Sequence, residues 1–493
     1  MSRNLSRRTF ISTTATLAAA ATGGLAAPGL VVRAADDGSP VQLGSRRELF
    51  VDGLLIDRLS GKASLRLARP HDEGIAIPFD RPWEGAFCGY VTVLRDGDLY
   101  RAYYRGLPMA RADGSNSETT CCAESRDGIH WTKPNLGLFE VEGSRDNNVI
   151  LAGLAPFSHN FSPLVDTRPG VNADERWKAL AGTSKTGLAA FVSADGLRWR
   201  KLREAPVITG GAFDSQNIAF WSESEQCYVS YFRTFKEGVR RITRTTSADF
   251  LTWSEPGLME YGDKPIEHLY TNQTGPYFRA PQLYVATAAR FLPGRKVITA
   301  EQARAIKVDP GYFGDCSDGI LMTTRGGNQY DRSFMDGFIR PGVGLENWVS
   351  RTNYPALGIV PTGMAEMSVY ANQNYGQPSA HLQRYSLRTD GFVAVNAPYE
   401  GGELLTKPLV FSGKELAVNF ATSAAGSVRV EIQDAGGSPR NGFTLADSLE
   451  TIGNELDRVI HWKSGTDVGA LAGKPVRLRF VLQDADIYSL RFV

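Results

Sequence analysis

Hydrophobic residues along most of the chain occur in short runs that are separated by Gly, Asp and Pro. Residues 88–106 and 218–235 are typical, with Val, Tyr and Phe interleaved with polar residues. Alternation with a period of two places one face of an extended segment against a core, and β-branched and aromatic residues favour strands. The pattern therefore predicts an all-β protein.

A short motif, Ser/Thr-x-Asp-Gly-x-x-aromatic, recurs after several of these predicted strands. Copies begin at Ser125 (SRDGIHW), Ser193 (SADGLRW) and Ser247 (SADFLTW), with weaker ones at Thr324 (TRGGNQY) and Arg388 (RTDGFVA). The Asp-Gly pair suits a tight turn, and the aromatic residue can fix an outer strand on the core. With the strands that precede each copy, the pattern gives five units of about four strands. Such repetition predicts a five-bladed β-propeller, with an ordinary β-sandwich as the alternative.

The motif also divides the chain into domains. We expect the propeller at residues 81–400, preceded by a lead-in strand and covering segment at 36–80. Residues 405–493 keep the alternating pattern but lack the turn motif. They predict a small antiparallel β-sandwich that follows the propeller.

Residues 1–35 have the features of an export signal. Arg7 and Arg8 precede an Ala-rich apolar stretch that ends in small residues near Ala34, which resembles a twin-arginine signal. Gly and Pro interrupt this stretch, and no other segment approaches the length of a membrane span. We therefore expect a mature protein that begins near Asp36, is periplasmic or secreted, and has no membrane span.

Charge and cysteine content narrow the class of ligand. Among 493 residues, 54 Lys and Arg stand against 53 Asp and Glu, which gives no electrostatic reason to expect a nucleic-acid partner. The five cysteines lack CxxC spacing, so we expect free thiols and no zinc site. The sequence shows no motif for phosphate, nicotinamide or haem. We therefore expect no organic cofactor and leave a structural calcium ion and the oligomeric state open.

Polar side chains gather where the predicted blades begin. The clearest case is 210–221, where Asp214, Gln216 and Asn217 directly precede an apolar run. The inner strands of a propeller converge on one axial pocket, so these groups can meet there although they are distant in sequence. Three hydrogen-bonding groups exceed the needs of a turn, and we expect this cluster to bind a polyol.

A five-bladed propeller followed by a sandwich resembles glycoside hydrolase family 32 and the related family 43, and also uncharacterised propeller proteins of planctomycete-type bacteria. In family 32 the blades begin with an aspartate nucleophile, a supporting aspartate and a glutamate acid/base, at a long and then a short interval. Glu84, Asp214 and Glu267 follow this rhythm. The resemblance implies that Glu267 is the general acid/base, that Asp214 stabilises the transition state, and that Glu84 is the base or nucleophile. The family motifs around these positions are not complete, since His268 stands where cysteine is usual and no Asn-Asp-Pro-Asn-Gly is present.

From these residues we expect an exported glycoside hydrolase that cleaves a neutral oligo- or polysaccharide with paired carboxylates. The residues expected to contact the substrate are His159, Asn160, Gln216, Asn217, His268, Tyr270, Asn272, Arg279 and Glu366. One alternative is a non-catalytic carbohydrate-binding propeller, which predicts a single carboxylate in the axial pocket. A second is a sialidase-like hydrolase of acidic sugars, which needs several arginines there, and a lyase acting on acidic polysaccharide is a third.

Overall fold

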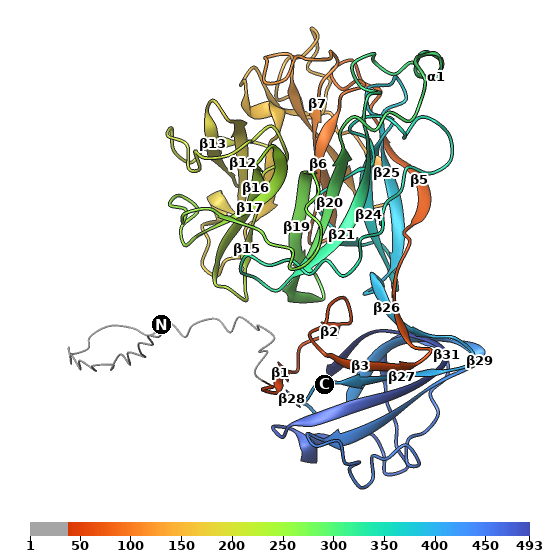
Figure 1. Cartoon of the computed structure of the whole chain (residues 1–493). Coiled ribbons are helices and arrows are strands. Elements are labelled where there is room, and N and C mark those ends of the chain that lie inside the picture. The colour runs from red at the N-terminus through yellow and green to blue at the C-terminus, as the bar shows by residue number, and fades with distance from the viewer. Residues whose placement is uncertain (1–37) are drawn as a thin grey trace, which may run out of the picture.

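The computed structural model describes residues 38–493, which fold almost entirely as β-strands (Figure 1). Five sheets stand around a common axis, and a sixth sheet lies below this ring in Figure 1. The helices of the described residues are short: α1 (Ala300–Ala305) and three 3-10 turns, η1 (Phe157–His159), η2 (Ala173–Glu175) and η3 (Gly469–Leu471). Within residues 38–493 no helix is long and apolar enough to cross a membrane. The predicted export signal at 1–35 lies outside the described residues.

The first three blades follow one another along the chain, and in each blade neighbouring strands pair antiparallel. Blade one contains β6 (Gly89–Asp96), β7 (Leu99–Gly106), β8 (Thr119–Ser125), β9 (Trp131–Thr132) and β10 (Val149–Ala152). Blade two contains β11 (Ser162–Val165), β12 (Trp177–Thr183), β13 (Gly187–Ser193) and β14 (Arg200–Lys201). Blade three contains β15 (Ile218–Ser222), β16 (Cys227–Lys236), β17 (Val239–Ser247) and β18 (Gly257–Leu258).

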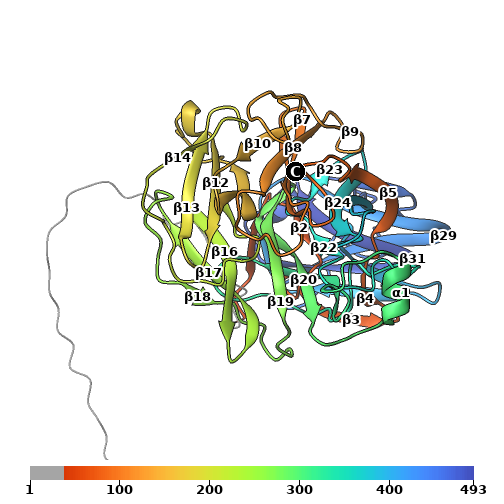
Figure 2. The ribbon, with the colours of Figure 1, turned by 90° about the horizontal axis from the view of Figure 1, so that it is seen from above.

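The last two blades complete the ring, as the view from above shows (Figure 2). Blade four contains β19 (Leu269–Tyr277), β20 (Ala280–Leu292) and β21 (Cys316–Thr324). Blade five contains β22 (Tyr354–Pro355), β23 (Val360–Pro361), β24 (Glu366–Gln373), β25 (His381–Arg388) and, at its outer edge, β5 (His71–Pro78). The pairing of β5 with β25 brings Ile77 opposite Leu382. A strand that precedes blade one therefore closes the ring, and the predicted five-bladed propeller is confirmed.

The sixth sheet has ten strands and is built from both ends of the described chain. It contains β1 (Val41–Gly44), β2 (Glu48–Leu49), β3 (Ile56–Gly61), β4 (Ser64–Leu67), β26 (Val393–Ala397), β27 (Gly402–Thr406), β28 (Leu409–Phe411), β29 (Leu416–Asp434), β30 (Asn454–Val459) and β31 (Val476–Phe492). We call this sheet, with its loops, the second unit. Residues 41–67 are therefore part of it rather than a lead-in segment, because the long strand β31 pairs with N-terminal and C-terminal strands alike.

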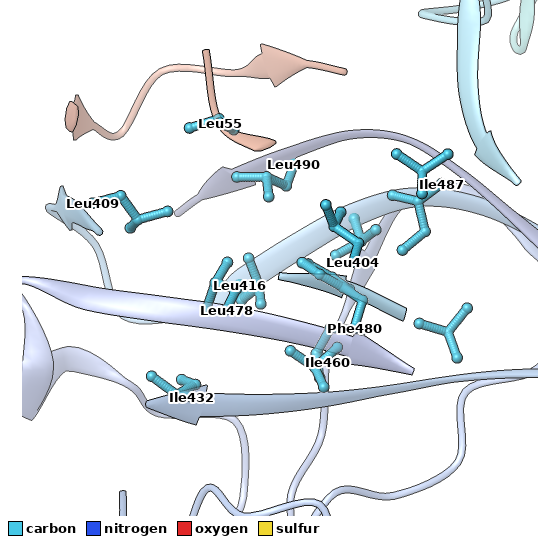
Figure 3. Packing of buried hydrophobic residues seen from close by; sticks show 14 of the residues in the cluster. Leu55, Leu404, Leu409, Leu416, Ile432, Ile460, Leu478, Phe480, Ile487 and Leu490 are labelled. Atoms are coloured by element: carbon cyan, nitrogen blue, oxygen red, sulfur yellow. The ribbon is translucent and has the colours of Figure 1, made fainter. Parts of the chain in front are cut away.

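The second unit encloses a hydrophobic core of its own. The close view shows Leu55, Leu404, Leu478, Phe480 and Leu490 packed among its strands (Figure 3). All five side chains are almost completely buried. Burial of each large aliphatic or aromatic side chain contributes about 1.5–3 kcal/mol. This core stabilises the second unit independently of the packing between blades.

A buried ionic cluster joins the propeller to the second unit. Its centre is Asp390, which follows β25 and is fully buried. From blade four, Tyr277 donates its hydroxyl to Asp390 at 2.7 Å and Arg279 pairs with it at 2.8 Å. From the second unit, Ser489 donates to Asp390 at 2.6 Å and Arg47 lies at 3.4 Å. Arg279, which the sequence pattern assigned to substrate binding, therefore holds the two parts of the protein together.

The repeated motif forms the same hydrogen-bonded turn in the first three blades. In blade two, Asp195 Oδ1 accepts the backbone N–H groups of Leu197 and Arg198, each at 2.8 Å. Asp127 and Asp249 make the equivalent contacts in blades one and three. These turns connect the two outermost strands of each blade, so the motif serves the fold and not the axial pocket.

Replacement of Asp195 by Ala is expected to lower the free energy of unfolding by about 1–2 kcal/mol, because two backbone N–H groups lose their acceptor. Burial raises the pKa of Asp195, but the hydrogen bonds of the turn outweigh it and lower the pKa to about 2. The contribution of the ionised Asp195 side chain to the free energy of unfolding is therefore present above the pKa of an unfolded aspartate, and it is lost as the pH falls towards 2. Urea denaturation at pH 7 and pH 3 measures it. The exposed Asp263, which pairs only with its neighbour Lys264, gives the control Asp263→Ala, and equal stability of the two variants would contradict the assignment.

Candidate active site

One pocket lies on the propeller axis, on the side where the blades begin. It lies between side chains of blades one, three, four and five. The wall includes Tyr90, Arg105, Asp113, Asp214, Gln216, Tyr270, Arg351, Tyr354 and Tyr375. The Gln216 side chain donates to the backbone carbonyl of Val91 at 3.0 Å and accepts from Gln273 at 2.9 Å. These amides connect the inner strands of three blades across the axis and form the floor of the pocket.

Asp214 faces this pocket, as the sequence pattern predicted, and 49% of its side chain is exposed. Its Oδ1 lies 2.9 Å from Nε2 of His159 and accepts the hydroxyl of Tyr90 at 3.1 Å. The hydroxyl of Tyr270 donates to Oδ2 at 3.4 Å, and Nη2 of Arg233 lies 3.7 Å from the same oxygen. One carboxylate is therefore surrounded by four donors while one side of it stays open.

The charges around Asp214 fix its protonation state. Burial raises its pKa, but the hydrogen bond and charge of His159 and the charges of Arg233 and Arg351 hold the pKa well below the usual range. Burial in turn lowers the pKa of His159, and the hydrogen bonds to Asp214 and Glu118 outweigh this effect, so that the pKa is raised. At neutral pH Asp214 is ionised and cannot donate a proton.

Behind His159 lies a second, buried carboxylate. Oε1 of Glu118 is 2.7 Å from Nδ1 of His159 and 3.8 Å from the guanidinium group of Arg105. Glu118 also accepts the backbone N–H of Gly114 at 2.9 Å, which fixes the loop that carries Asp113. His159 is therefore held between Glu118 and Asp214 and supports the position and charge of the pocket carboxylate.

Asp113, Glu118 and His159 offer three ligand atoms within 4.8 Å of one another, a spacing that a metal ion could use. Both ring nitrogens of His159, however, contact carboxylates, and Arg105 lies against Glu118. A histidine that binds a metal ion must be neutral, with a free lone pair on the nitrogen that contacts the metal. His159, with both ring nitrogens engaged and the Arg105 guanidinium group beside it, does not meet this requirement, and we assign no metal to the cluster.

Asp113 is a pocket residue that the sequence pattern missed. It is exposed and lies in the loop between β7 and β8, within the segment RADGSN. The polar groups predicted to face the axis precede inner strands, whereas this loop leaves the second strand of blade one. Only its position beside Glu118 and His159 shows that it shares the pocket with Asp214.

The other two predicted catalytic carboxylates do not line the pocket. Glu267 pairs with Arg290 at 3.2 Å and with Arg332. Glu84 is fully buried, where it pairs with Lys133 at 2.6 Å and accepts the hydroxyl of Tyr104 at 2.7 Å. Each of these glutamates is thus neutralised by a cation of its own blade. The expected constellation of Asp214, Glu267 and Glu84 in one pocket is not formed.

The predicted substrate contacts divide in the same way. Gln216 and Tyr270 line the pocket, and His159 contacts its carboxylate. The remaining side chains make contacts elsewhere: Asn160 and Asn217 with the backbone carbonyls of Phe213 and Ser215, Asn272 with Tyr330, His268 with the backbone N–H of Arg240, Arg279 with Asp390, and Glu366 with Arg384. The buried amides of Asn160, at the start of blade two, and Asn217, at the start of blade three, therefore hold the loop that presents Asp214, rather than a ligand.

No family model matches this chain. Two uncharacterised proteins of Mycobacterium tuberculosis, from strains CDC 1551 and H37Rv, are each 29% identical to it over 135 residues. These residues are 27% of this chain and 40% of each relative, so the chain spans less than half the length of the curated relatives it matches.

Among solved structures, the chain is similar to an N-acetylgalactosamine deacetylase from F. plautii (12% identity, TM-score 0.44, covering 66% of this chain and 96% of that one). It is also similar to a fructofuranosidase from Schwanniomyces occidentalis (12% identity, TM-score 0.39, covering 87% of this chain and 99% of that one). A glycosyl hydrolase from Bacteroides ovatus is a further similar structure (12% identity, TM-score 0.38, covering 71% of this chain and 94% of that one). Solved glycoside hydrolases are thus among the structures that the chain resembles. The likenesses are distant, and the five blades are established by the sheets described above.

Proposed function

We propose that this protein is a carbohydrate-active hydrolase that cleaves a glycosidic bond in an oligo- or polysaccharide bound in the axial pocket. The observation that carries the proposal is the ionised, half-exposed carboxylate of Asp214 in a pocket walled by tyrosines. Aromatic faces and a few fixed polar groups suit a ring with many hydroxyls. An anionic oxygen in such a pocket can stabilise the positive charge that develops on a sugar ring during bond cleavage.

Glycoside hydrolysis needs a second carboxyl group that protonates the leaving oxygen. Asp113 lines the same pocket as Asp214, and we assign this role to it in place of Glu267. Asp214 then serves as the nucleophile or as the stabiliser of the oxocarbenium-like transition state. His159 and Glu118 act as positioning residues, because their contacts keep Asp214 ionised and oriented towards the pocket.

The test is a screen of neutral and acidic oligosaccharides with the purified protein. Hydrolysis is followed by the appearance of new reducing ends, and binding is followed by calorimetry on the same compounds. A hydrolase gives new reducing ends from at least one compound that it binds. If every bound compound is recovered intact, the proposal is wrong.

A non-catalytic carbohydrate-binding propeller is the second candidate. It is favoured by the ion pairs of Glu84 and Glu267, which keep both carboxylates out of the pocket. This candidate predicts saccharide binding in the axial pocket without any product, so the same screen separates the two functions.

We further propose that the protein is exported by the twin-arginine route. Such substrates fold before translocation, and all five cysteines are free in the structure, as a chain that folds in the reducing cytoplasm requires. Replacing Arg7 and Arg8 together by Lys is expected to leave the precursor in the cytoplasm, as measured by fractionation and immunoblotting. Arg3→Lys is the matched control and should export normally. Normal export of the double variant would refute this route.

A further inference from the structure

The basic side chains around the axial pocket outnumber its carboxylates: Arg105, His159, Arg233, Arg240 and Arg351 stand against Asp113, Glu118 and Asp214. His159 and Arg105 face Glu118, and Asp214 faces His159 and Arg233. Arg351 lines the pocket, yet it takes part in none of the ion pairs found among residues 38–493. Its polar contact there is the hydroxyl of Tyr312 at 3.4 Å. Arg351 is therefore a pocket cation without a carboxylate partner.

Two further guanidinium groups lie around the same aromatic ring. The guanidinium carbons of Arg233, Arg240 and Arg351 lie 4.6, 5.1 and 5.6 Å from the ring centroid of Tyr270, respectively. Arg240 also lacks a carboxylate partner among the described ion pairs. Tyr270 lines the pocket, so three positive charges converge on one wall, and of the three only Arg233 lies within ion-pairing distance of a carboxylate among the described residues, at 3.7 Å from Asp214.

Several donors on this side of the pocket have no acceptor. The Arg233 side chain is only 6% exposed, and within the described part of the chain its Nε and Nη1 make no hydrogen bond. The hydroxyl of Tyr354, another wall residue, is likewise buried without a partner there. A buried donor without an acceptor costs about 1–3 kcal/mol. Such donors next to an unpaired arginine indicate a site that is completed by an acceptor from outside the protein.

We propose that the substrate carries an oxyanion, a carboxylate or a sulfate ester, and that Arg351 binds it with support from Arg233 and Tyr354. The planar fork of an arginine matches two oxygens of such a group, and charge-assisted hydrogen bonds are the strong ones. This inference rests on the proposed function and replaces the neutral saccharide expected from sequence with an acidic one. Because Asp214 repels an anion, the oxyanion lies on the Arg351 side, and the sugar carbon to be attacked lies beside Asp214.

The experiment uses a panel of oligosaccharides in matched pairs: uronate-containing glycans with their methyl esters, and sulfated glycans with their desulfated forms. The wild-type protein is expected to bind the acidic member of a pair more tightly, and to lose this preference as salt is raised. Arg351→Gln should weaken binding of the acidic member by about 10- to 100-fold and weaken binding of the neutral member much less. Preference for uronates or for sulfates then identifies the oxyanion.

The matched control is Arg340→Gln, which changes an arginine that is half-exposed and pairs loosely with Asp336 at 3.9 Å. Arg351→Lys keeps the positive charge but lacks the planar guanidinium group, so its affinity for the acidic member should lie between those of wild type and Arg351→Gln. Thermal melts confirm that each variant is folded. If the wild-type protein binds and hydrolyses the acidic and neutral members of every pair equally well, and Arg351→Gln does not change the acidic member selectively, this inference is overturned and the proposed function stands. If acidic glycans bind through Arg351 but stay intact, the proposed hydrolase function is wrong and the inference of an oxyanion site stands. Absence of binding to every glycan would overturn both.

Discussion

Asp214→Asn is expected to bind a confirmed saccharide substrate within a few-fold of wild type and to turn it over about 10²–10³ times more slowly. The substitution keeps the shape of the side chain and its contact distance to Tyr90 but removes the negative charge. That charge matters most when positive charge develops on the sugar ring, so the loss falls on the transition state and not on the bound substrate. Steady-state kcat and KM, measured from new reducing ends, separate the two effects.

Asp263→Asn is the control for this measurement, because Asp263 is exposed and, among residues 38–493, its ion pair is with its neighbour Lys264. A second comparison is Glu267→Gln, which removes charge from the ion pairs with Arg290 and Arg332 outside the pocket. Its kcat should stay close to wild type if Asp214 and Asp113 carry the chemistry. An unchanged kcat in Asp214→Asn, or a larger loss of kcat in Glu267→Gln than in Asp214→Asn, would show that Asp214 does not carry the reaction.

The largest effect on stability is expected at the junction of the two units. Asp390→Ala should lower the free energy of unfolding by about 3–5 kcal/mol, because it leaves Arg47 and Arg279 without the buried carboxylate between them. Burial already lowers the pKa of Arg47, and the charge of Asp390 opposes that effect. Urea denaturation followed by tryptophan fluorescence measures the loss.

Asp457 provides the matched control at the junction. It pairs with Arg47 and Arg279 as well, but 36% of its side chain is exposed. Exposed ion pairs contribute about 0–1 kcal/mol, so Asp457→Ala should cost much less than Asp390→Ala. Equal losses in the two variants would show that burial of Asp390 does not set the strength of the junction.

The propeller could be predicted because its signal is local. Each copy of the turn motif contains both the aspartate and the backbone N–H groups that it accepts, so a few consecutive residues specify the turn. Closure of the ring could not be predicted in this way. Strand β5 carries no motif, and its partner β25 lies about 300 residues further along the chain.

The site was predictable only in part for the same reason. Asp214 stood out because Gln216 and Asn217 follow it directly in the sequence, and Asn217 holds its loop. Glu267 looked equally suitable, but Arg290 and Arg332, which neutralise it, are remote in sequence and become neighbours only in the folded blade. Asp113 lies in a loop without any periodic pattern, so nothing in the sequence connected it with Asp214.

The placement of the most N-terminal strands has a consequence for biosynthesis. The ring closes only when β5 pairs with β25. In the second unit, β2 and β27 both pair with β31, the most C-terminal strand. The second unit therefore cannot finish folding before its last strand has been synthesised, whereas the ring of blades needs only the residues up to the end of β25. Contacts of such long sequence separation slow folding, and until they form the unpaired edge of β25 is open to association with other chains. A recombinant fragment that starts after residue 80 lacks β5 and keeps that edge exposed permanently, so recombinant forms of this protein need both ends of the described chain.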